Sequence, residues 1–196
     1  DMCSSDLPLD DHWVLIALPP NQYDSFQANK YLYSNYNELV KQLILETSSA
    51  LGRGWTVIVN LHPRCERSIV LEVAKLGGKV IEKPLEELLP LAELFVASAS
   101  ATLRWAIACQ VPAINYDLYR YEYEDYRSCV GIAEAKSAEE YRALLFKFKE
   151  DFCGDASWKK RQHSDSRQNF LFDGNSESRI LDVVTYLMKQ SHRIVT

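Results

Sequence analysis

The segment of residues 94–117, LFVASASATLRWAIACQVPAINYD, constrains the fold of this chain most strongly. It begins with a strand-length apolar run, residues 94–97, and a turn of small and hydroxyl residues follows at 98–102. The spacing then predicts a helix over residues 103–109 and a second strand over residues 111–115. Strand, turn, helix and strand form a βαβ unit, whose crossover is right-handed in nearly all proteins. The segment therefore predicts two parallel strands covered by a helix.

The same alternation of strand-length apolar runs and helical patterns extends along the chain. Strands are predicted at residues 13–18, 55–61, 79–82, 94–97, 111–115 and 129–133, and helices at 37–51, 66–76, 85–91, 103–109, 137–148 and 177–189. Repeated strand–helix units indicate an α/β fold with a Rossmann-like parallel sheet and helices on both faces. The length of 196 residues suits one large domain, which we assign to residues 13–196, after an acidic linker or tail at residues 1–12.

Composition excludes several classes of protein. The net charge of −5 argues against a nucleic-acid partner. No apolar run reaches the roughly 20 residues that cross a bilayer and no signal peptide is visible, so we expect no transmembrane segment and a cytoplasmic location, at most peripheral at the inner membrane. Five cysteines without C-x-x-C spacing favour a reducing compartment over disulfides or zinc. Because the chain starts at Asp1 without a methionine, we expect it to be part of a longer polypeptide.

Motif searches exclude other chemistries. The chain has no G-x-G-x-x-G dinucleotide motif and no G-x4-G-K-[ST] phosphate loop. It also has no G-x-S-x-G nucleophile elbow, which argues against a serine hydrolase. The four histidines lack the spacing of metal ligands, so no metal site is predicted.

The turn that follows the predicted strand at residues 94–97 is the first candidate binding loop. It carries Ser98, Ser100 and Thr102 at the carboxyl end of that strand. Free backbone N–H groups and the dipole of the following helix favour an anion there, which indicates a phosphate-binding turn. The alternative is an ordinary helix N-cap, because Ser and Thr satisfy the first N–H groups of many helices. The sequence leaves both interpretations open.

A second candidate loop follows the predicted strand at residues 55–61. His62 can donate a hydrogen bond to a phosphate or a ribose, and Pro63 restricts the loop backbone. Arg64 can bind a phosphate in a bidentate manner. The same residues are also common in purely structural loops.

The third candidate loop contains Lys83, Pro84 and Leu85, whose exposed backbone groups can hydrogen-bond to the edge of a base. All three loops leave the carboxyl ends of parallel strands. Ligands of open α/β sheets bind in a crevice at that edge. We therefore expect the three loops to line one binding site.

Two tyrosine-rich segments, residues 23–36 and 116–126, leave further alternatives open. Their aromatic rings can stack on a sugar or base, or can pack a long loop onto the domain. The second segment also contains acidic residues, which are either paired carboxylates at the crevice or a solvated surface: Asp117, Glu122, Glu124 and Asp125.

Four stretches carry a resemblance to a known family: LHPR at residues 61–64, EKPLEELLPLAELFVASAS at 82–100, the segment at 106–114, and FDGNSESRI at 172–180. Their order resembles the C-terminal, nucleotide-binding half of GT-B glycosyltransferases. The likeness is to transferases of bacterial capsule and surface polysaccharides, with kinship to Kdo transferases and sialyltransferases.

The resemblance implies a function. In such families a His-Pro motif and a Ser motif hold the nucleotide and phosphate of the donor, which here implies His62, Pro63, Ser98 and Ser100. His62 and Arg64 would stabilise the charge that grows on the leaving nucleotide, an electrostatic form of catalysis. The donor would be a CMP- or UDP-activated sugar, and neither a metal nor another cofactor is implied.

The implied partners are the donor, a glycan acceptor, and an N-terminal GT-B half that this chain lacks. That half normally supplies the general base. The isolated chain is therefore expected to bind donor without turnover.

Two positions depart from the family patterns. Trp105 stands where many GT-B proteins have a glutamate that holds the ribose, which puts a UDP donor in doubt. UDP-N-acetylglucosamine 2-epimerases share the order of elements, but their turn contains glycines that residues 98–102 lack. The alternatives are an epimerase-like sugar-nucleotide enzyme and a non-catalytic interaction module whose tyrosine-rich segments contact a partner.

Overall fold

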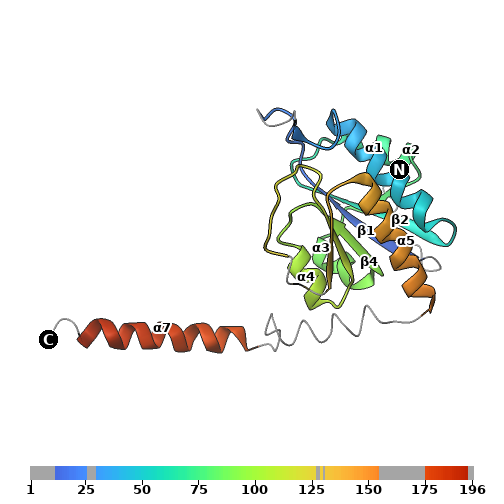
Figure 1. Cartoon of the computed structure of the whole chain (residues 1–196). Helices are drawn as coiled ribbons and strands as arrows, with labels where there is room; N and C mark the ends of the chain where they lie inside the picture. Colours follow the sequence, from blue (N-terminus) through green and yellow to red (C-terminus); the bar gives the residue numbers. More distant parts are fainter. Residues whose placement is uncertain (1–11, 26–29, 127–128, 130, 155–174, 194–196) are drawn as a thin grey trace.

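A computed structural model describes residues 12–25, 30–126, 129, 131–154 and 175–193 (Figure 1). It contains one six-stranded sheet in which every neighbouring pair is parallel. The strands are β1 (His12–Leu18), β2 (Trp55–Leu61), β3 (Lys79–Val80), β4 (Leu94–Ala97), β5 (Ala113–Tyr116) and β6 (Ile132–Ala135). Their spatial order is β3-β2-β1-β4-β5-β6, which is the Rossmann order and confirms the predicted fold class.

Helices cover both faces of the sheet, as the sequence predicts (Figure 1). One face packs against α1 (Tyr36–Leu51), α2 (Ser68–Lys75) and α5 (Ala138–Gly154), and the other against α3 (Leu85–Leu88), η2 (Leu89–Leu91) and α4 (Leu103–Ala108). Successive side chains of a strand point to opposite faces, so β1 supplies Val14 and Ile16 to the first core and Leu15 to the second. Burial on both faces explains why the central strands are continuous apolar runs.

Local sequence signals set the helix ends. Asn35 caps α1, because its Oδ1 accepts a hydrogen bond from the backbone N of Glu38 at 2.9 Å. The helix stops at Gly52, whose φ of 72° is in the left-handed region. At the start of α5 the backbone N of Glu140 donates to Ser137 Oγ, and its carboxylate accepts from the backbone N of Lys136. These two hydrogen bonds cap the start of α5 in the manner of a capping box.

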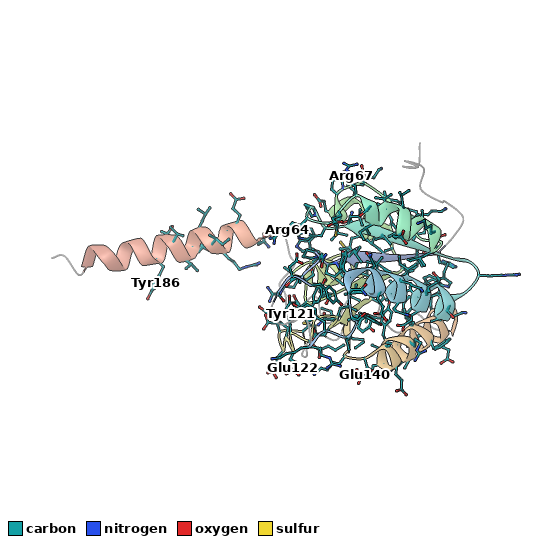
Figure 2. All side chains as sticks on the ribbon, turned by 90° about the horizontal axis from the view of Figure 1, so that it is seen from above. Arg64, Arg67, Tyr121, Glu122, Glu140 and Tyr186 are labelled. Carbon is teal, nitrogen blue, oxygen red and sulfur yellow. The ribbon has the colours of Figure 1, made fainter. Side chains whose placement is uncertain are left out.

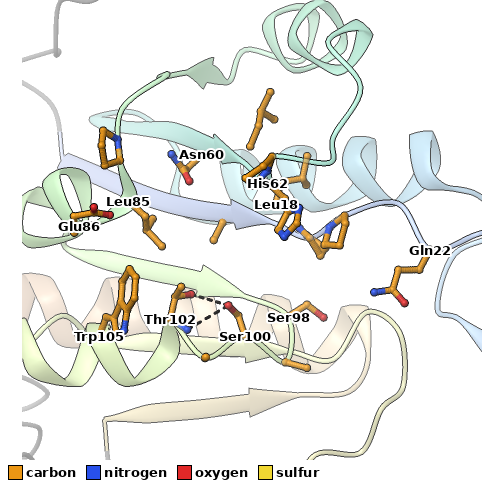
Figure 3. Close-up of a pocket in the computed structure, with 18 of the residues that line it drawn as sticks. Leu18, Gln22, Asn60, His62, Leu85, Glu86, Ser98, Ser100, Thr102 and Trp105 are labelled. Carbon is orange, nitrogen blue, oxygen red and sulfur yellow. Dashed lines mark hydrogen bonds between the residues drawn. The ribbon is translucent and has the colours of Figure 1, made fainter.

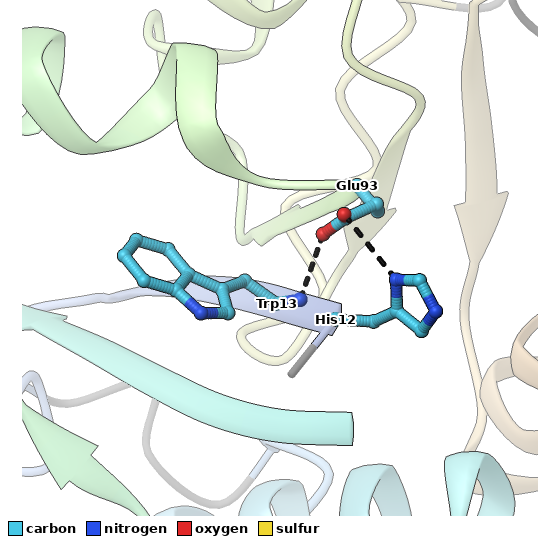
Figure 4. A network of polar contacts seen from close by, with 3 residues as sticks. All are labelled: His12, Trp13 and Glu93. Atoms are coloured by element: carbon cyan, nitrogen blue, oxygen red, sulfur yellow. Dashed lines mark hydrogen bonds and ion pairs between the residues drawn. The ribbon is translucent and has the colours of Figure 1, made fainter. Parts of the chain in front are cut away.

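The first strand starts at His12, one residue earlier than predicted. The backbone N of His12 donates to the carbonyl of Gly54, and the backbone N of Trp13 donates to Glu93 Oε2 at 2.7 Å (Figure 4). His12 Nδ1 lies 3.4 Å from the other carboxylate oxygen of Glu93. These contacts fix the amino end of β1. The rest of the predicted tail, residues 1–11, lies outside the described residues.

Three other predicted strands have wrong boundaries. β3 ends at Val80 rather than at residue 82, β5 covers Ala113–Tyr116 rather than 111–115, and β6 covers Ile132–Ala135 rather than 129–133. Before β6 the backbone N of Cys129 donates to the carbonyl of Tyr126, and the N of Ile132 donates to the carbonyl of Cys129. These turn hydrogen bonds occupy residues that the apolar pattern assigns to the strand.

The last helix, α7 (Ser176–Arg193), confirms the predicted helix near residues 177–189. Several large apolar side chains on it are exposed: Ile180, Leu181, Val183, Val184 and Tyr186 (Figure 2). The linking residues 155–174 are outside the described part of the chain. Within the described residues, none of the helices combines the length and the hydropathy needed to cross a membrane.

Candidate functional site

A cavity of about 610 Å³ lies at the carboxyl edge of the sheet (Figure 3). It sits at the switch point between β1 and β4, from which the chain winds outward in both directions. Its walls come from the carboxyl ends of five strands and the loops that follow them. They are residues 17–20 and Gln22 at the end of β1, 60–63 at the end of β2, 83–86 after β3, 98–102 with Trp105 after β4, and Tyr119 and Tyr121 after β5. The three loops singled out in the sequence therefore meet in one cavity.

Hydrogen bonds from neighbouring loops hold the turn at residues 98–102. Ser98 is buried, and its Oγ accepts from the backbone N of Leu118 at 3.2 Å. Ala99 has a φ of 44°, a left-handed conformation that costs a non-glycine residue energy. Its backbone N donates to Asn115 Oδ1 at 2.9 Å, which stabilises that conformation. The chain thus bends sharply between β4 and α4.

The geometry of this turn bears on both interpretations. Ser100 Oγ accepts from the backbone N of Thr102 at 3.3 Å and lies 2.8 Å from Thr102 Oγ1, while Thr102, the N-cap residue of α4, makes no side-chain capping hydrogen bond. The backbone N–H groups of Ser100 and Ala101 have no acceptor among the described residues. Both residues line the cavity. The hydroxyl groups of the turn therefore bond within the turn, and two backbone N–H groups remain as donors for a ligand.

His62 lies on the opposite wall of the cavity from Ser100 (Figure 3). Its Nδ1 accepts a hydrogen bond from the backbone N of Arg64 at 3.1 Å. Burial, followed by the nearby Arg64 charge, lowers the pKa of the imidazole from its ordinary value. The ring is therefore neutral at pH 7 with its proton on Nε2, which makes it a hydrogen-bond donor.

Arg64 is placed differently from the other predicted site residues. Its side chain is exposed at the surface (Figure 2) and is not among the described residues that line the cavity. Its backbone N–H holds His62. Phosphate binding by its guanidinium stays a prediction.

Lys83, Pro84 and Leu85 line the far end of the cavity, beside Glu86. Asn60 Nδ2 donates to the carbonyl oxygen of Lys83 at 2.9 Å and so holds this loop against β2. Across the cavity from Leu85 and Glu86 stands Trp105, which is 47% exposed (Figure 3). This end combines a flat indole with the side chain of Lys83 and the first turn of α3.

Tyrosine hydroxyl groups fix the loop after β1. The carbonyl oxygens of Pro19 and Pro20 accept from Tyr36 and Tyr119, each at 2.6 Å, and that of Gln22 accepts from Tyr31 at 3.4 Å. Burial raises the pKa of Tyr36 and Tyr119 far above the usual range, so both hydroxyls stay protonated donors. These three tyrosines pack and anchor a loop, which is the second of the two roles left open by the sequence. Tyr119 also lines the cavity.

The acidic residues of the second tyrosine-rich segment do not form a pair in the cavity. Asp117 is buried, and its two carboxylate oxygens accept from the backbone N of Tyr121 and of Glu122, each at 2.8 Å. These bonds stabilise the left-handed φ values of 52° at Arg120 and 53° at Glu122. Asp125 lies 3.7 Å from Arg104. Glu86 is the one acidic side chain among the described lining residues, so the paired-carboxylate hypothesis is not supported.

Sequence reasoning missed three cavity residues, Gln22, Asn60 and Glu86, and included Tyr121 only within the tyrosine-rich segment 116–126. Asn60 is a polar residue near the end of an apolar strand, and this signal could have been used. Trp105 was noted only as a departure from a family pattern. Within the described residues, no group of three or more His, Cys, Asp or Glu side chains is arranged to hold a metal ion.

Comparison with solved structures relates this fold to glycosyltransferases. The glycotransferase of kitacinnamycin matches 92% of this chain with a TM-score of 0.62 and 13% identity. The wall teichoic acid polymerase TagF, in a structure with CDPG, matches 95% with a TM-score of 0.59 and 14% identity. The spinosyn rhamnosyltransferase SpnG, complexed with thymidine diphosphate, matches 83% with a TM-score of 0.55 and 14% identity.

These matches cover 44%, 44% and 42% of the three enzymes, so this chain spans less than half of their length. It shares the Rossmann-like fold of GT-B glycosyltransferases, as the resemblance implies. A protein described as a UDP-N-acetylglucosamine 2-epimerase from Listeria monocytogenes matches 79% of this chain and 39% of its own, with a TM-score of 0.52 and 10% identity. No protein-family model and no curated protein sequence matches this chain.

Proposed function

We propose that this chain is the donor-nucleotide-binding part of a glycosyltransferase of bacterial surface-polysaccharide synthesis, with a CMP- or UDP-activated sugar as donor. The observation that carries the proposal is the cavity at the β1–β4 switch point, with His62 on one wall and the 98–102 turn on the other. Nucleotides bind to Rossmann-like sheets at this point. The glycosyltransferases among the fold neighbours support the class of enzyme.

The donor phosphates would lie between the two walls. The N–H groups of Ser100 and Ala101 and the Nε2–H of His62 are donors that can converge on one anion. Negative charge grows on the leaving nucleotide as the glycosidic bond breaks. Donors fixed in advance by the fold stabilise that charge without reorganisation, which lowers the barrier. Ser98 and Thr102 complete this wall, and Arg64 would add its positive charge from the rim.

The nucleoside would lie toward residues 83–86. Lys83 offers a cation, Pro84 lines the same end, and the backbone N–H of Leu85, which has no acceptor among the described residues, can donate to the edge of a base. Trp105 offers an aromatic face on the other side of this end, and stacking on an aromatic side chain is a common way to hold a base. This arrangement places the base at one end of the cavity and the phosphates between His62 and the 98–102 turn.

A second half would complete the enzyme. The fold neighbours are more than twice as long as the part that this chain matches. In the proposed enzyme the missing part carries the general base and the site for the glycan acceptor. The isolated chain then binds the donor nucleotide without transferring sugar.

Titration calorimetry with CMP, CDP and UDP tests the proposal. At least one nucleotide should bind more tightly than millimolar, and His62→Ala, which removes a donor, should weaken that binding about tenfold or more. Ser100→Ala keeps the backbone N–H and removes the hydroxyl that bonds Thr102, so it should weaken binding less, by loosening the turn. His12→Ala, at the opposite edge of the sheet, is the matched control and should leave the affinity unchanged. If no nucleotide binds more tightly than millimolar, the proposal fails and the interaction-module alternative gains support.

The epimerase fold neighbour supports one second candidate, a sugar-nucleotide epimerase. The turn without glycine argues against it. Incubation with UDP-N-acetylglucosamine and no acceptor distinguishes the two functions. Epimerisation with release of UDP would favour the epimerase, whereas a donor that is bound and left intact favours the transferase.

A further inference from the structure

We propose that the end of the cavity lined by Gln22 and Tyr121 holds the group that the donor transfers, and that this group is an uncharged polyol. The inference rests on the proposed function and deepens it. It depends on two observations: a fixed pair of hydrogen-bonding side chains at this end, and the distribution of charge along the cavity walls.

The two ends of the cavity differ in chemistry. Leu85, Glu86 and Trp105 stand at one end, the serine turn and His62 lie toward the middle, and Gln22 stands at the other end (Figure 3). A donor with its base at the first end and its phosphates in the middle extends its transferred group toward Gln22. The order of the loops therefore assigns the Gln22 end to that group.

Gln22 is held at its backbone and at its side chain. Its backbone carbonyl accepts from the backbone N of Ser25 at 3.0 Å and from the Tyr31 hydroxyl at 3.4 Å. Its side-chain Oε1 accepts from the Tyr121 hydroxyl at 2.5 Å. Tyr121 is held in turn, because its backbone N donates to Asp117 Oδ1 at 2.8 Å. Gln22 and Tyr121 thus form a bridge between the loops after β1 and β5.

The bridge leaves a donor and an acceptor side by side. With Oε1 occupied, Gln22 retains two N–H groups on Nε2, and these have no acceptor among the described residues. The Tyr121 hydroxyl donates its proton to Gln22 and retains oxygen lone pairs that can accept. A hydroxyl group both donates and accepts, so two neighbouring hydroxyls match this pair. A carboxylate only accepts, so it can bond the Gln22 N–H groups but leaves the Tyr121 lone pairs without a partner.

The charges on the cavity walls favour the same conclusion. Among the described residues that line the cavity, Lys83 and Glu86 carry the formal charges, and both belong to the loop after β3. Gln22, Tyr119, Tyr121 and the two prolines supply no cation at the opposite end. An acidic sugar would have to lose water around its carboxylate there without an opposite charge, which is unfavourable. The walls therefore select neutral sugars over acidic ones.

Calorimetry on the full chain with neutral and acidic pairs tests the inference. The matched pair is UDP-glucose against UDP-glucuronate. In the cytidine series CDP-glucose is compared with CDP, and CMP-N-acetylneuraminate with CMP, because the two donors differ by one phosphate. In the series whose free nucleotide binds, the neutral sugar should raise the affinity over that of its own free nucleotide at least tenfold more than the acidic sugar does. Gln22→Arg should reverse that preference, because it places a cation at this end.

Tyr121→Phe isolates the contribution of the bridge. It removes the hydroxyl that orients Gln22, so affinity for the neutral sugar nucleotide should fall several-fold while affinity for the free nucleotide stays the same. Tyr123→Phe is the matched control on an exposed neighbour outside the cavity lining and should change neither affinity.

Two results overturn the inference in distinguishable ways. If the free nucleotide binds but the acidic sugar nucleotide binds as tightly as the neutral one, or Tyr121→Phe has no effect, the polyol subsite is wrong and the proposed function stands. If none of the nucleotides binds more tightly than millimolar, the proposed function and the subsite fail together.

Discussion

At the amino edge of the sheet, Glu93 accepts a hydrogen bond from the backbone N–H of Trp13. The ring of Trp55 packs there against three other rings, with centroid distances of 5.2 Å to His12, 5.6 Å to Phe148 and 5.2 Å to Phe152. At the carboxyl edge the backbone donors of Ser100 and Ala101 face a cavity of about 610 Å³ without an acceptor among the described residues. Side chains at the amino edge pack and hydrogen-bond with one another, whereas the carboxyl edge has backbone N–H donors that can bind a ligand. The comparison predicts that substitutions at the first edge change stability and substitutions at the second change binding.

A tryptophan stands at each edge, and the largest effect is expected at the amino edge. Trp55→Ala removes the ring at the centre of the aromatic cluster, so we expect the free energy of unfolding to fall by about 2–3 kcal/mol, somewhat below the range for fully buried tryptophans. Urea denaturation measures the loss. Nucleotide affinity should stay the same at a temperature where the variant is folded, and a parallel loss of binding would contradict the separation of the two edges.

The loop after β1 lies at the carboxyl edge, but hydrogen bonds from tyrosine hydroxyls hold it in place, so substitutions there should change stability, as at the amino edge. Tyr36→Phe removes the buried hydroxyl donor to the Pro19 carbonyl and leaves that oxygen only the weak Cys65 Sγ donor at 3.6 Å, so stability should fall by about 1–2 kcal/mol. Chemical denaturation gives the value, with Tyr123→Phe, on an exposed tyrosine, as the control. A change below the error of the measurement would mean that water replaces the hydroxyl and that the loop does not depend on it.

Trp105 is the counterpart of Trp55 at the open edge. Trp105→Ala should lower nucleotide affinity about tenfold, equivalent to ~1.4 kcal/mol, through lost stacking. Because the ring is 47% exposed, stability should change by no more than about 0.5 kcal/mol. Calorimetry and thermal melting on the same sample test both values. Normal affinity with reduced stability would reverse the role assigned to this residue.

The smallest expected effect is a pH dependence that comes from His62. Its pKa in the folded chain is lowered from the ordinary value, mainly by burial, so the unfolded chain takes up the proton first as the pH falls. This contribution to stability is fully present above the unfolded pKa of about 6.5 and is lost as the pH drops below it. Between pH 7 and pH 5 the free energy of unfolding, measured by denaturation, should therefore fall less for His62→Gln than for the unchanged chain. Equal slopes would place the imidazole in an environment like water.

The sequence predicts the sheet well wherever one apolar run has clear stops. The bounds of β2 and β4 agree with the prediction to the residue, because glycines precede β2 and a serine turn follows β4. The prediction for β6 fails by two to three residues, because turn hydrogen bonds of Cys129, which depend on the folded chain, take up the start of the run.

The meeting of the three loops is also predictable, since parallel strands present all their carboxyl ends at one edge. The remaining walls are not. Gln22 and Tyr121 are 99 positions apart and meet only because β1 and β5 lie on either side of β4. The exposed position of Arg64 likewise depends on how the loop after β2 turns, which residue type alone does not determine.

The most direct test of the account is a nitrogen-15 NMR titration of the chain with the nucleotide that binds best in calorimetry. We expect the largest shifts at the amides of Ser100 and Ala101, which have no acceptor among the described residues, with smaller shifts at Leu85 and Glu86. The amide of Trp13, bonded to Glu93 at the opposite edge, should not move. Saturable binding that leaves Ser100 and Ala101 unshifted would contradict the claim that this turn holds the donor phosphate.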